Sequence, residues 1–499
     1  MTGQSTDDRL FVSRLNEEVG MRSFSKDFIF GASSSAFQIE GSPEADGKGP
    51  SIWDEFAARP KAARGGSGAK TACDHYRRWE EDVGIASELG LDAYRFSVSW
   101  PRVMPEGKGR VNRAGIDFYS RLVDGLLERG VRPFPTLFHW DLPLALQRGL
   151  GGFQSRDVAF LFADYAAELG KALGDRVKDW ITINEPFEFA CFGHLFGTHA
   201  PGVKNPFAYL PALHHQLLGH GLAVGAVRAE VPGGRIGVAL SWTPVHPART
   251  APSRAAEADA AAAARTNAFM NEISFAPILK KAYPALVSGG RILRAPIRPG
   301  DLDVIGAPLD FVGLNYYSRE RARNNPFAPL IRADVTGKEP RELPETDGRT
   351  AMGWEVYHDG IAEILEDLRV DYGNPPVIMT EFGSAWTDEV EIRQLPPGTG
   401  PGTRAGKRVR DSRRARYLRD ALGRMHEAMA RGSDLRGAFV WSLTDNFEWA
   451  EGNAKRFGLV HVDYATQERV VKDSGLWYAR MIAARDLDAV PAEGDPGLS

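Results

Sequence analysis

The chain has 499 residues, of which 43% are hydrophobic and 25% are charged, a composition that is ordinary for a globular enzyme. Its formal net charge of −4 excludes the broad basic surface with which proteins bind nucleic acid or anionic membranes. No apolar run is long enough to span a membrane, and residues 1–20 lack the apolar core of a secretory signal. We therefore expect a cytoplasmic enzyme with neither nucleic acid nor a membrane as partner.

Eight short apolar runs rich in β-favouring residues alternate with helical patterns along the chain. The predicted strands cover residues 28–34, 93–98, 132–139, 180–184, 236–242, 310–317, 377–381 and 437–443. The helical patterns that follow them cover residues 71–89, 114–129, 157–173, 208–229, 255–282, 354–372, 412–431 and, more weakly, 472–483. A strand followed by a helix, repeated eight times, is typical of a closed parallel (β/α)8 TIM barrel. The spacing alone also allows an open, doubly wound sheet.

The chain is long for one domain, but (β/α)8 barrels with insertions exceed about 400 residues. We therefore expect a single α/β catalytic domain over residues 25–483, with surface tails at residues 1–24 and 484–499. Two segments rich in glycine, proline and arginine, 321–349 and 391–410, are predicted to be loop insertions. Active sites of such barrels lie at the carboxyl ends of the strands, and we expect these extended loops to border the site.

Two glutamates stand where predicted strands end. Glu185 directly follows the strand 180–184, and Glu381 is the last residue of the strand 377–381. A carboxylate at the end of a buried strand is costly to desolvate unless it has a task or a partner. Paired carboxylates on either side of one bond are what glycoside hydrolysis requires. The pair therefore predicts a glycosidase site, although structural salt bridges would also explain two strand-end carboxylates.

Nine short segments, most of them near predicted strand ends, occur in a particular order. They are FIFGA at 28–32, FQIEG at 37–41, SIWD at 51–54, YRFSVSW at 94–100, HWDLP at 139–143, TINEP at 182–186, GLNYY at 313–317, TEFG at 380–383 and DNFEW at 445–449. In this order the segments resemble glycoside hydrolase family 1, the β-glucosidase family. The resemblance runs from about residue 28 to residue 478, and the number of segments makes it specific.

The resemblance implies a role for each glutamate. Glu185 matches the family's acid/base and Glu381 its nucleophile. The implied reaction is a double displacement that retains the anomeric configuration and releases terminal non-reducing β-D-glycosyl residues. Retaining enzymes hold their two carboxyl groups about 5–5.5 Å apart. The implied partner is a small-molecule β-glycoside or oligosaccharide, with no cofactor and no metal ion, and a homo-oligomer is left open.

The resemblance also implies two sets of supporting residues. The residues that match the nucleophile's supports are Arg95, Tyr317 and Asn315. The residues that match the sugar-binding set are Gln38, His139, Asn184, Trp441, Glu448 and Trp449, with Trp354 on the aglycone side. Without the resemblance, Arg95 would be assigned to a barrel salt bridge, Asn184 to a turn cap and the aromatic residues to core packing.

Three residues depart from the family pattern. Phe382 stands in the nucleophile motif where asparagine is usual, and Phe187 stands where tryptophan commonly follows Asn-Glu-Pro. Asn453 replaces a frequent tyrosine. We expect these changes to affect the rim and the aglycone side, and Phe382 to affect how the nucleophile's loop packs.

Three other functions compete with that of a β-glucosidase with added galactosidase or fucosidase activity. A 6-phospho-β-glycosidase would resemble this chain but carry serine at the position of Glu448, where a carboxylate repels a phosphate dianion. A catalytically silent carbohydrate-binding barrel usually lacks one of the two glutamates. A transglycosidase with a specialised acceptor remains open.

Cys73 and Cys191 lie in no metal-binding pattern, and two reduced thiols are favoured over a disulfide.

Overall fold

The computed structural model describes residues 22–64, 68–288, 295–336, 344–392 and 406–491. Within them, eight parallel strands close into a barrel in the order β1-β13-β10-β7-β5-β4-β3-β2. The barrel strands are β1 Ile29–Ser33, β2 Ala93–Ser97, β3 Arg132–Phe138, β4 Asp179–Asn184, β5 Arg235–Ser241, β7 Phe311–Tyr316, β10 Val377–Phe382 and β13 Leu435–Trp441. The closed barrel confirms the predicted fold class, and the open sheet was the wrong alternative.

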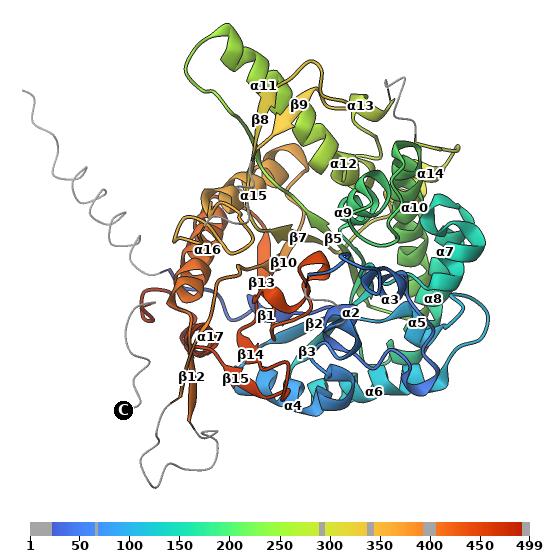
Figure 1. Ribbon diagram of the computed structural model, residues 1–499, viewed down its shortest axis with the longest axis vertical. Coiled ribbons are helices and arrows are strands. Elements are labelled where there is room, and N and C mark those ends of the chain that lie inside the picture. The colour runs from blue at the N-terminus through green and yellow to red at the C-terminus, as the bar shows by residue number, and fades with distance from the viewer. Residues whose placement is uncertain (1–21, 65–67, 289–294, 337–343, 393–405, 492–499) are drawn as a thin grey trace, which may run out of the picture.

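Helices surround the barrel, and in Figure 1 their colours pass once round it from blue to red. The outer helices are α4 His75–Glu88, α6 Arg113–Glu128, α8 Asp157–Leu173, α10 Pro206–Glu230, α12 Ile273–Leu279, α15 Asp359–Asp371, α16 Ser412–Ala430 and α17 Asp473–Ala484. Each occupies a segment predicted to be helical. The helix predicted over 255–282 is present as α11 Arg254–Asn267, a π-helical turn at Ala268–Glu272 and α12, which follow one another without a break. The π-helical turn itself was not predicted.

A layer of apolar side chains fills the barrel. Each barrel strand contributes one buried residue to it: Ile29, Ala93, Phe134, Ile181, Ala239, Phe311, Ile378 and Phe439. The ring of Phe134 meets that of Phe439 edge to face, with centroids 5.0 Å apart. Since this layer makes the barrel a packed core rather than a pore, a substrate can reach only the ends of the strands.

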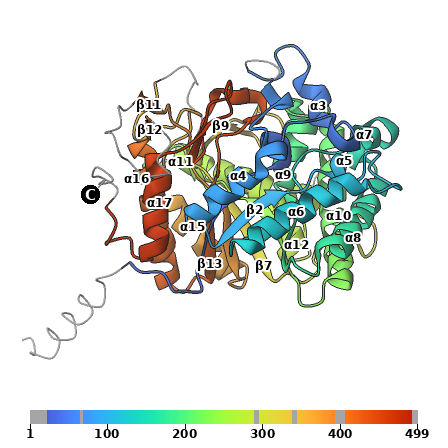
Figure 2. The same ribbon diagram turned by 90° about the horizontal axis from the view of Figure 1, so that it is seen from below.

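Further short elements lie in the segments between barrel strands and outer helices, and β11, β12 and α3 gather toward the upper side of Figure 2. They are α2 Ala36–Ile39, α3 Ile52–Ala57, α5 Trp100–Val103, α7 Leu144–Leu150, α9 Pro186–Ala190, β6 Val245–Pro247, α13 Ala285–Ser288, α14 Asp301–Ile305, β8 Glu320–Asn324, β9 Ala333–Val335, β11 Glu389–Ile392, β12 Lys407–Arg410, β14 Val460–Val462 and β15 Arg469–Val471. The predicted insertions 321–349 and 391–410 contain the end of β8 with β9 and the paired strands β11 and β12. Their residues 337–343 and 393–405 lie outside the described part.

Parts of the two predicted surface tails, 1–24 and 484–499, pack on the barrel instead of lying on the surface. Phe24 is buried and its N–H donates to Arg485 O at 2.8 Å. Leu487 is fully buried and Val490 is 7% exposed. These contacts contradict a surface tail that starts at residue 484, because this segment packs on the barrel. We propose that the catalytic domain extends past Leu487 to Val490.

Two expectations based on residue content can be compared with the structure. Cys73 and Cys191 are both buried and neither forms a disulfide, as expected for reduced thiols. Among the residues described, no helix combines the length and the apolar character needed to cross a membrane.

Candidate active site

The two predicted catalytic glutamates lie at the carboxyl ends of β4 and β10. Glu185 directly follows β4, and Glu381 is the last but one residue of β10. Glu185 is 7% exposed and Glu381 is 3% exposed. Glu185 has a left-handed backbone, with φ of 47°, which is uncommon for a residue with a side chain and occurs at functional positions. Its N–H donates to Ala239 O of β5 at 2.9 Å, which ties this conformation to the barrel.

Each oxygen of the Glu381 carboxylate accepts a hydrogen bond. Arg95, from β2, donates from Nη1 to Oε1 at 2.5 Å, and its side chain is fully buried. Tyr317, which follows β7, donates from its hydroxyl to Oε2 at 2.7 Å. A buried guanidinium and a phenol that both donate to one carboxylate stabilise its negative charge. The two donors hold the Glu381 carboxylate in a fixed orientation.

The surroundings of Glu185 favour its protonated form. Burial raises the pKa of Glu185 well above its ordinary value, and the negative charges of Glu188 and Glu381 raise it further. Asn315, from β7, donates from Nδ2 to Glu185 Oε1 at 2.8 Å and acts in the opposite direction. The charge of Arg95 also lowers this pKa, but burial is the largest effect. Burial and the two neighbouring negative charges therefore favour the protonated form of Glu185.

Asn184 connects the surroundings of the two glutamates. Its Oδ1 accepts a hydrogen bond from Arg95 Nη2 at 2.7 Å and another from Asn315 Nδ2 at 3.1 Å. Arg95 in turn binds Glu381, and Asn315 binds Glu185. The two carboxylates therefore share one hydrogen-bonded network of buried polar side chains, which fixes their relative placement.

Gln38 and Glu448 form a second polar pair in the segments after the neighbouring strands β1 and β13. Gln38 Nε2 lies 3.3 Å from Glu448 Oε2 and donates to Phe447 O at 3.0 Å. Ser35 Oγ donates to Gln38 Oε1 at 2.6 Å, which fixes the orientation of the amide. Burial, and then the charge of Glu381, raises the pKa of Glu448 to about 8. At pH 7 the Glu448 carboxyl can therefore both donate and accept.

His139 follows β3 and is 2% exposed. Because Asn184 Oδ1 already accepts two hydrogen bonds, its Nδ2 is the donor to His139 Nε2, at 3.1 Å. Burial, and then the charge of Arg95, holds the pKa of His139 well below its ordinary value, so the ring is neutral. The ring proton is then on Nδ1, which is buried and has no hydrogen-bond partner among the residues described. Such a donor is costly unless a ligand accepts from it.

Aromatic rings flank His139. The ring of Trp441 lies 5.8 Å from that of His139 at an interplanar angle of 25°, and the ring of Trp449 lies 5.9 Å away at 23°. Near-parallel rings of this kind present flat apolar faces to a ligand. Trp354, which precedes α15 rather than lying on the helix as predicted, is 5.3 Å from the ring of Tyr317. The aromatic residues assigned to the sugar and to the aglycone are thus found beside the polar groups.

The sequence match to known proteins covers nearly all of this barrel. The description "Glycosyl hydrolase family 1" matches residues 21–487. The chain belongs to glycosyl hydrolase family 1. It is accordingly a glycoside hydrolase, and enzymes of family 1 are retaining β-glycosidases.

Three similar proteins illustrate the family. "Beta-glucosidase A" of Thermotoga maritima is 43% identical over 94% of this chain and 100% of its own length. The "Bifunctional beta-D-glucosidase/beta-D-fucosidase" of Bifidobacterium breve is 41% identical over 92% of this chain and 98% of its own length. The structure of the Thermotoga maritima β-glucosidase in complex with glucoimidazole superposes with a TM-score of 0.83 at 42% identity, and covers 93% of this chain and 99% of that one.

This family 1 chain uses two further residues that the sequence analysis missed. Trp140 Nε1 donates to Asn184 O at 3.0 Å, and its ring lies 4.7 Å from that of Trp449. Thr136 Oγ1 accepts from Arg95 Nε at 3.1 Å. Trp140 stands next to His139 in the segment HWDLP, so the segment itself carried the signal. Thr136 lies within a predicted strand, where one threonine gives no such indication.

Two of the three departures from the family pattern lie in the protein interior. Phe382 is fully buried in the main hydrophobic core. Phe187 is 6% exposed, and its ring meets those of Tyr209 and Phe269 edge to face. Both side chains therefore pack against buried neighbours instead of lying at an exposed rim, and the burial of Phe382 agrees with the expectation that it affects how the nucleophile's loop packs. Asn453 lies in the turn Trp449–Ala454 that follows Glu448.

Proposed function

We propose that this family 1 enzyme is a β-glucosidase that releases terminal non-reducing β-D-glucosyl residues and that also accepts β-galactosides and β-fucosides. The observation that carries the proposal is that the two catalytic glutamates have different surroundings. Glu381 accepts hydrogen bonds from Arg95 and Tyr317, whereas Glu185 is buried and has a raised pKa. Charged and protonated carboxyl groups side by side are what the first step of retaining hydrolysis needs.

The first step forms a bond between Glu381 and the sugar. A Glu381 oxygen attacks the anomeric carbon, and the bond from that carbon to the leaving oxygen breaks. Glu185 gives its proton to the leaving oxygen, so the aglycone departs as a neutral alcohol. The proton transfer leaves Glu185 as a carboxylate. The attack converts Glu381 into an uncharged ester.

The second step releases the sugar. Once Glu381 is esterified its negative charge is gone, and one cause of the raised pKa of Glu185 disappears with it. Glu185 then accepts a proton from a water molecule whose oxygen attacks the same anomeric carbon. The ester bond to Glu381 breaks, both glutamates return to their starting forms, and two inversions give net retention.

Recognition of the sugar is assigned to the polar groups beside the pair. The proton on His139 Nδ1 and the Glu448 carboxyl are the hydroxyl partners, and Gln38 adds amide atoms of fixed orientation. Trp441 provides a flat face for the ring. A polar group is left unpaired when the hydroxyl that it binds is inverted or missing, so the shell discriminates between sugars at the hydroxyls that it binds.

The similar proteins support the glucosidase proposal and the wider glycone range. The Thermotoga maritima relative is named a β-glucosidase, and the Bifidobacterium breve relative is named a bifunctional glucosidase and fucosidase. A 6-phospho-glycosidase is disfavoured because this chain has Glu448 at the position where such enzymes carry serine. Transfer to an acceptor other than water uses the same glycosyl-enzyme, so it is an additional outcome of this mechanism.

A panel of aryl β-glycosides tests the proposal. We expect kcat/KM to be highest for the glucoside, galactoside or fucoside, and lower by about 100-fold or more for the mannoside and the 6-phosphoglucoside, because a mismatched hydroxyl leaves buried groups unpaired. Proton NMR of the first product should show the β-anomer. An enzyme that cleaved only the 6-phosphoglucoside, or that released the α-anomer first, would contradict the proposal.

A further inference from the structure

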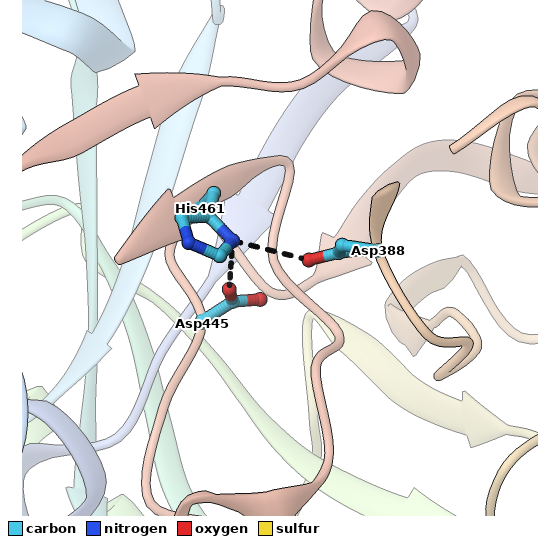
Figure 3. Close-up of side chains that lie close together, drawn as sticks. All are labelled: Asp388, Asp445 and His461. Carbon is cyan, nitrogen blue, oxygen red and sulfur yellow. Dashed lines mark hydrogen bonds and ion pairs between the residues drawn. The ribbon is translucent and has the colours of Figure 1, made fainter. Parts of the chain in front are cut away.

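A second group of charged residues lies in the segments that follow β10 and β13 (Figure 3). Asp388 and Asp445 point toward His461, whose Nδ1 is 3.3 Å from Asp388 Oδ2 and 3.6 Å from Asp445 Oδ2. The three ligand atoms lie within 4.8 Å of one another, so residue type and distance alone would allow a bound metal ion.

A lysine already provides the positive charge between these carboxylates. Lys472 Nζ is 2.8 Å from Asp388 Oδ2 and 2.7 Å from Asp445 Oδ1, and its side chain is fully buried. Arg414 contacts Asp388 at 3.3 Å, and Arg456 Nη1 donates to Asp445 Oδ2 at 2.7 Å. Each carboxylate thus has an arginine and shares the ammonium, so a metal ion would add charge to groups that are already compensated. The cluster is therefore an ion-pair network.

Asp445 stands at the base of the loop that presents Glu448. Its Oδ1 also accepts from Gly458 N at 3.0 Å, and its own N–H donates to Val460 O at 2.9 Å. Beyond Asp445, Phe447 N donates to the backbone oxygen of Gln38 at 3.0 Å. The carboxylate of Asp445 therefore anchors a segment whose next residues form the sugar-binding pair.

Asp388 ends the segment that leaves Glu381. This segment runs against β13, because a Cβ atom placed on Gly383 would lie 2.1 Å from Trp441 O. Residues 383–386 are buried, so the path from the nucleophile to Asp388 is packed along its length except at Thr387, which is exposed. A shift of Asp388 would therefore be transmitted toward the end of β10.

We propose that Lys472 is a positioning residue that holds the two halves of the active site at a fixed separation. Its ammonium joins the segment after Glu381 to the segment before Glu448 through Asp388 and Asp445. The inference rests on the proposed function, because it assigns attack on the sugar to Glu381 and recognition of the sugar to Glu448.

Loss of the ammonium would change the forces between the segments. Asp388 and Asp445 would lose the positive charge of Lys472, which lies between them. Their two negative charges would then repel each other strongly, because the site is buried. The segments would move apart, and the sugar held at Glu448 would be misplaced relative to Glu381. A displacement of about 1 Å at the reacting atoms costs roughly 100-fold in rate.

The first experiment compares two lysine-to-methionine variants. Lys472→Met keeps the length of the side chain and removes its charge. Lys407→Met is the matched control, since Lys407 pairs with Glu468 outside the active site and is 33% exposed. We expect kcat/KM for an aryl β-glucoside to fall roughly 100-fold in Lys472→Met, and to change by less than about twofold in the control. Rates are taken at a temperature where both variants are folded by circular dichroism.

A double-mutant cycle separates positioning from a loss of stability. Substitutions that act independently have effects that multiply, whereas substitutions that act through each other do not. If Lys472 acts by placing Glu448, the Lys472→Met substitution should cost less than about tenfold in a Glu448→Gln background. A purely structural role would cost the same roughly 100-fold in both backgrounds.

Two results would overturn the role of Lys472. The first is a Lys472→Met variant that keeps the wild-type kcat/KM, and the second is a loss of kcat/KM that is equal in the wild-type and Glu448→Gln backgrounds. If Lys472→Met does not fold, Asp388→Asn is measured in the same cycle, because it removes one end of the same link while retaining Lys472. An inactive wild type on every glycoside tested would refute the proposed function, whereas an active wild type with independent substitutions refutes only this inference.

Discussion

Glu185 and Glu381 carry the same side chain but have different neighbours. Glu381 accepts hydrogen bonds from Arg95 and Tyr317, whereas Glu185 accepts one from Asn315 and lies close to two other negative charges. The first environment stabilises a carboxylate, and the second favours the neutral acid. The division of roles therefore comes from the residues around each glutamate rather than from the glutamates themselves.

The raised pKa of Glu185 predicts the pH dependence of the reaction. Because the folded pKa lies above the ordinary value of 4.5, Glu185 stays protonated where an ordinary glutamate is ionised. The acid step is available below the raised pKa and is lost as pH rises through it. Glu188→Gln removes a negative charge that raises this pKa. We expect this substitution to move the basic limb of kcat/KM to lower pH.

The control for this prediction is Glu168→Gln, which removes a glutamate whose partner is the exposed Lys171 on the outside of α8. It should leave the pH profile unchanged. A basic limb that stays in place in Glu188→Gln, or that moves to higher pH, would show that Glu188 does not act on the acid. Profiles of kcat/KM report the free enzyme. The pKa of Glu448 is also raised, to about 8, and the charge of Glu381 acts on both groups, so the basic limb belongs to coupled groups.

At the scale of the elements, the strands were predictable because both faces of a parallel barrel strand are buried. Such strands appear in the sequence as continuous apolar runs. The π-helical turn inside the helix predicted over 255–282 was not predictable, for a reason outside the segment. Asn271 exchanges hydrogen bonds with the backbone of Thr243, in the loop after β5, at 2.8 and 3.0 Å. A π-helical turn that serves a tertiary contact leaves no trace in hydrophobic spacing.

The layer inside the barrel supports the strand ends that carry the site, and Phe439 tests its contribution to stability. Phe439 is fully buried and packs against Phe134. We expect Phe439→Ala to lower the free energy of unfolding by about 3–5 kcal/mol, because it leaves a cavity that the barrel cannot close. Phe327→Ala, at a side chain that is 93% exposed, should change it by less than about 0.5 kcal/mol. Urea unfolding of both variants measures the difference, and equal midpoints would contradict the account.

At the scale of the whole molecule, distant parts of the chain meet in two places. Near the two ends of the chain, the backbone of Phe24 is hydrogen-bonded to that of Arg485, and the active site brings together segments from β1 to β13. The main candidate residues of the site were predicted through family resemblance, since no local pattern places Gln38 beside Glu448. It missed the packing of Leu487 because one isolated apolar residue carries no periodic signal.

The network around Lys472 shows the same limit of sequence reasoning. Asp388, Asp445 and Lys472 lie in three separate segments, and none belongs to a pattern that predicts an ion pair. Their proximity follows from barrel closure, which places the segments after β10 and β13 side by side. Such a link becomes visible only when the whole fold is known.

The central claim is that Glu381 forms the covalent bond to the sugar while Glu185 supplies and takes back the proton. The most direct test uses a 2-deoxy-2-fluoro-β-glucoside with an activated leaving group, which slows release of the sugar, followed by mass spectrometry of peptides. The account predicts one fluoroglucosyl group per chain, attached to Glu381. A modified Glu185, or turnover without any covalent adduct, would contradict it.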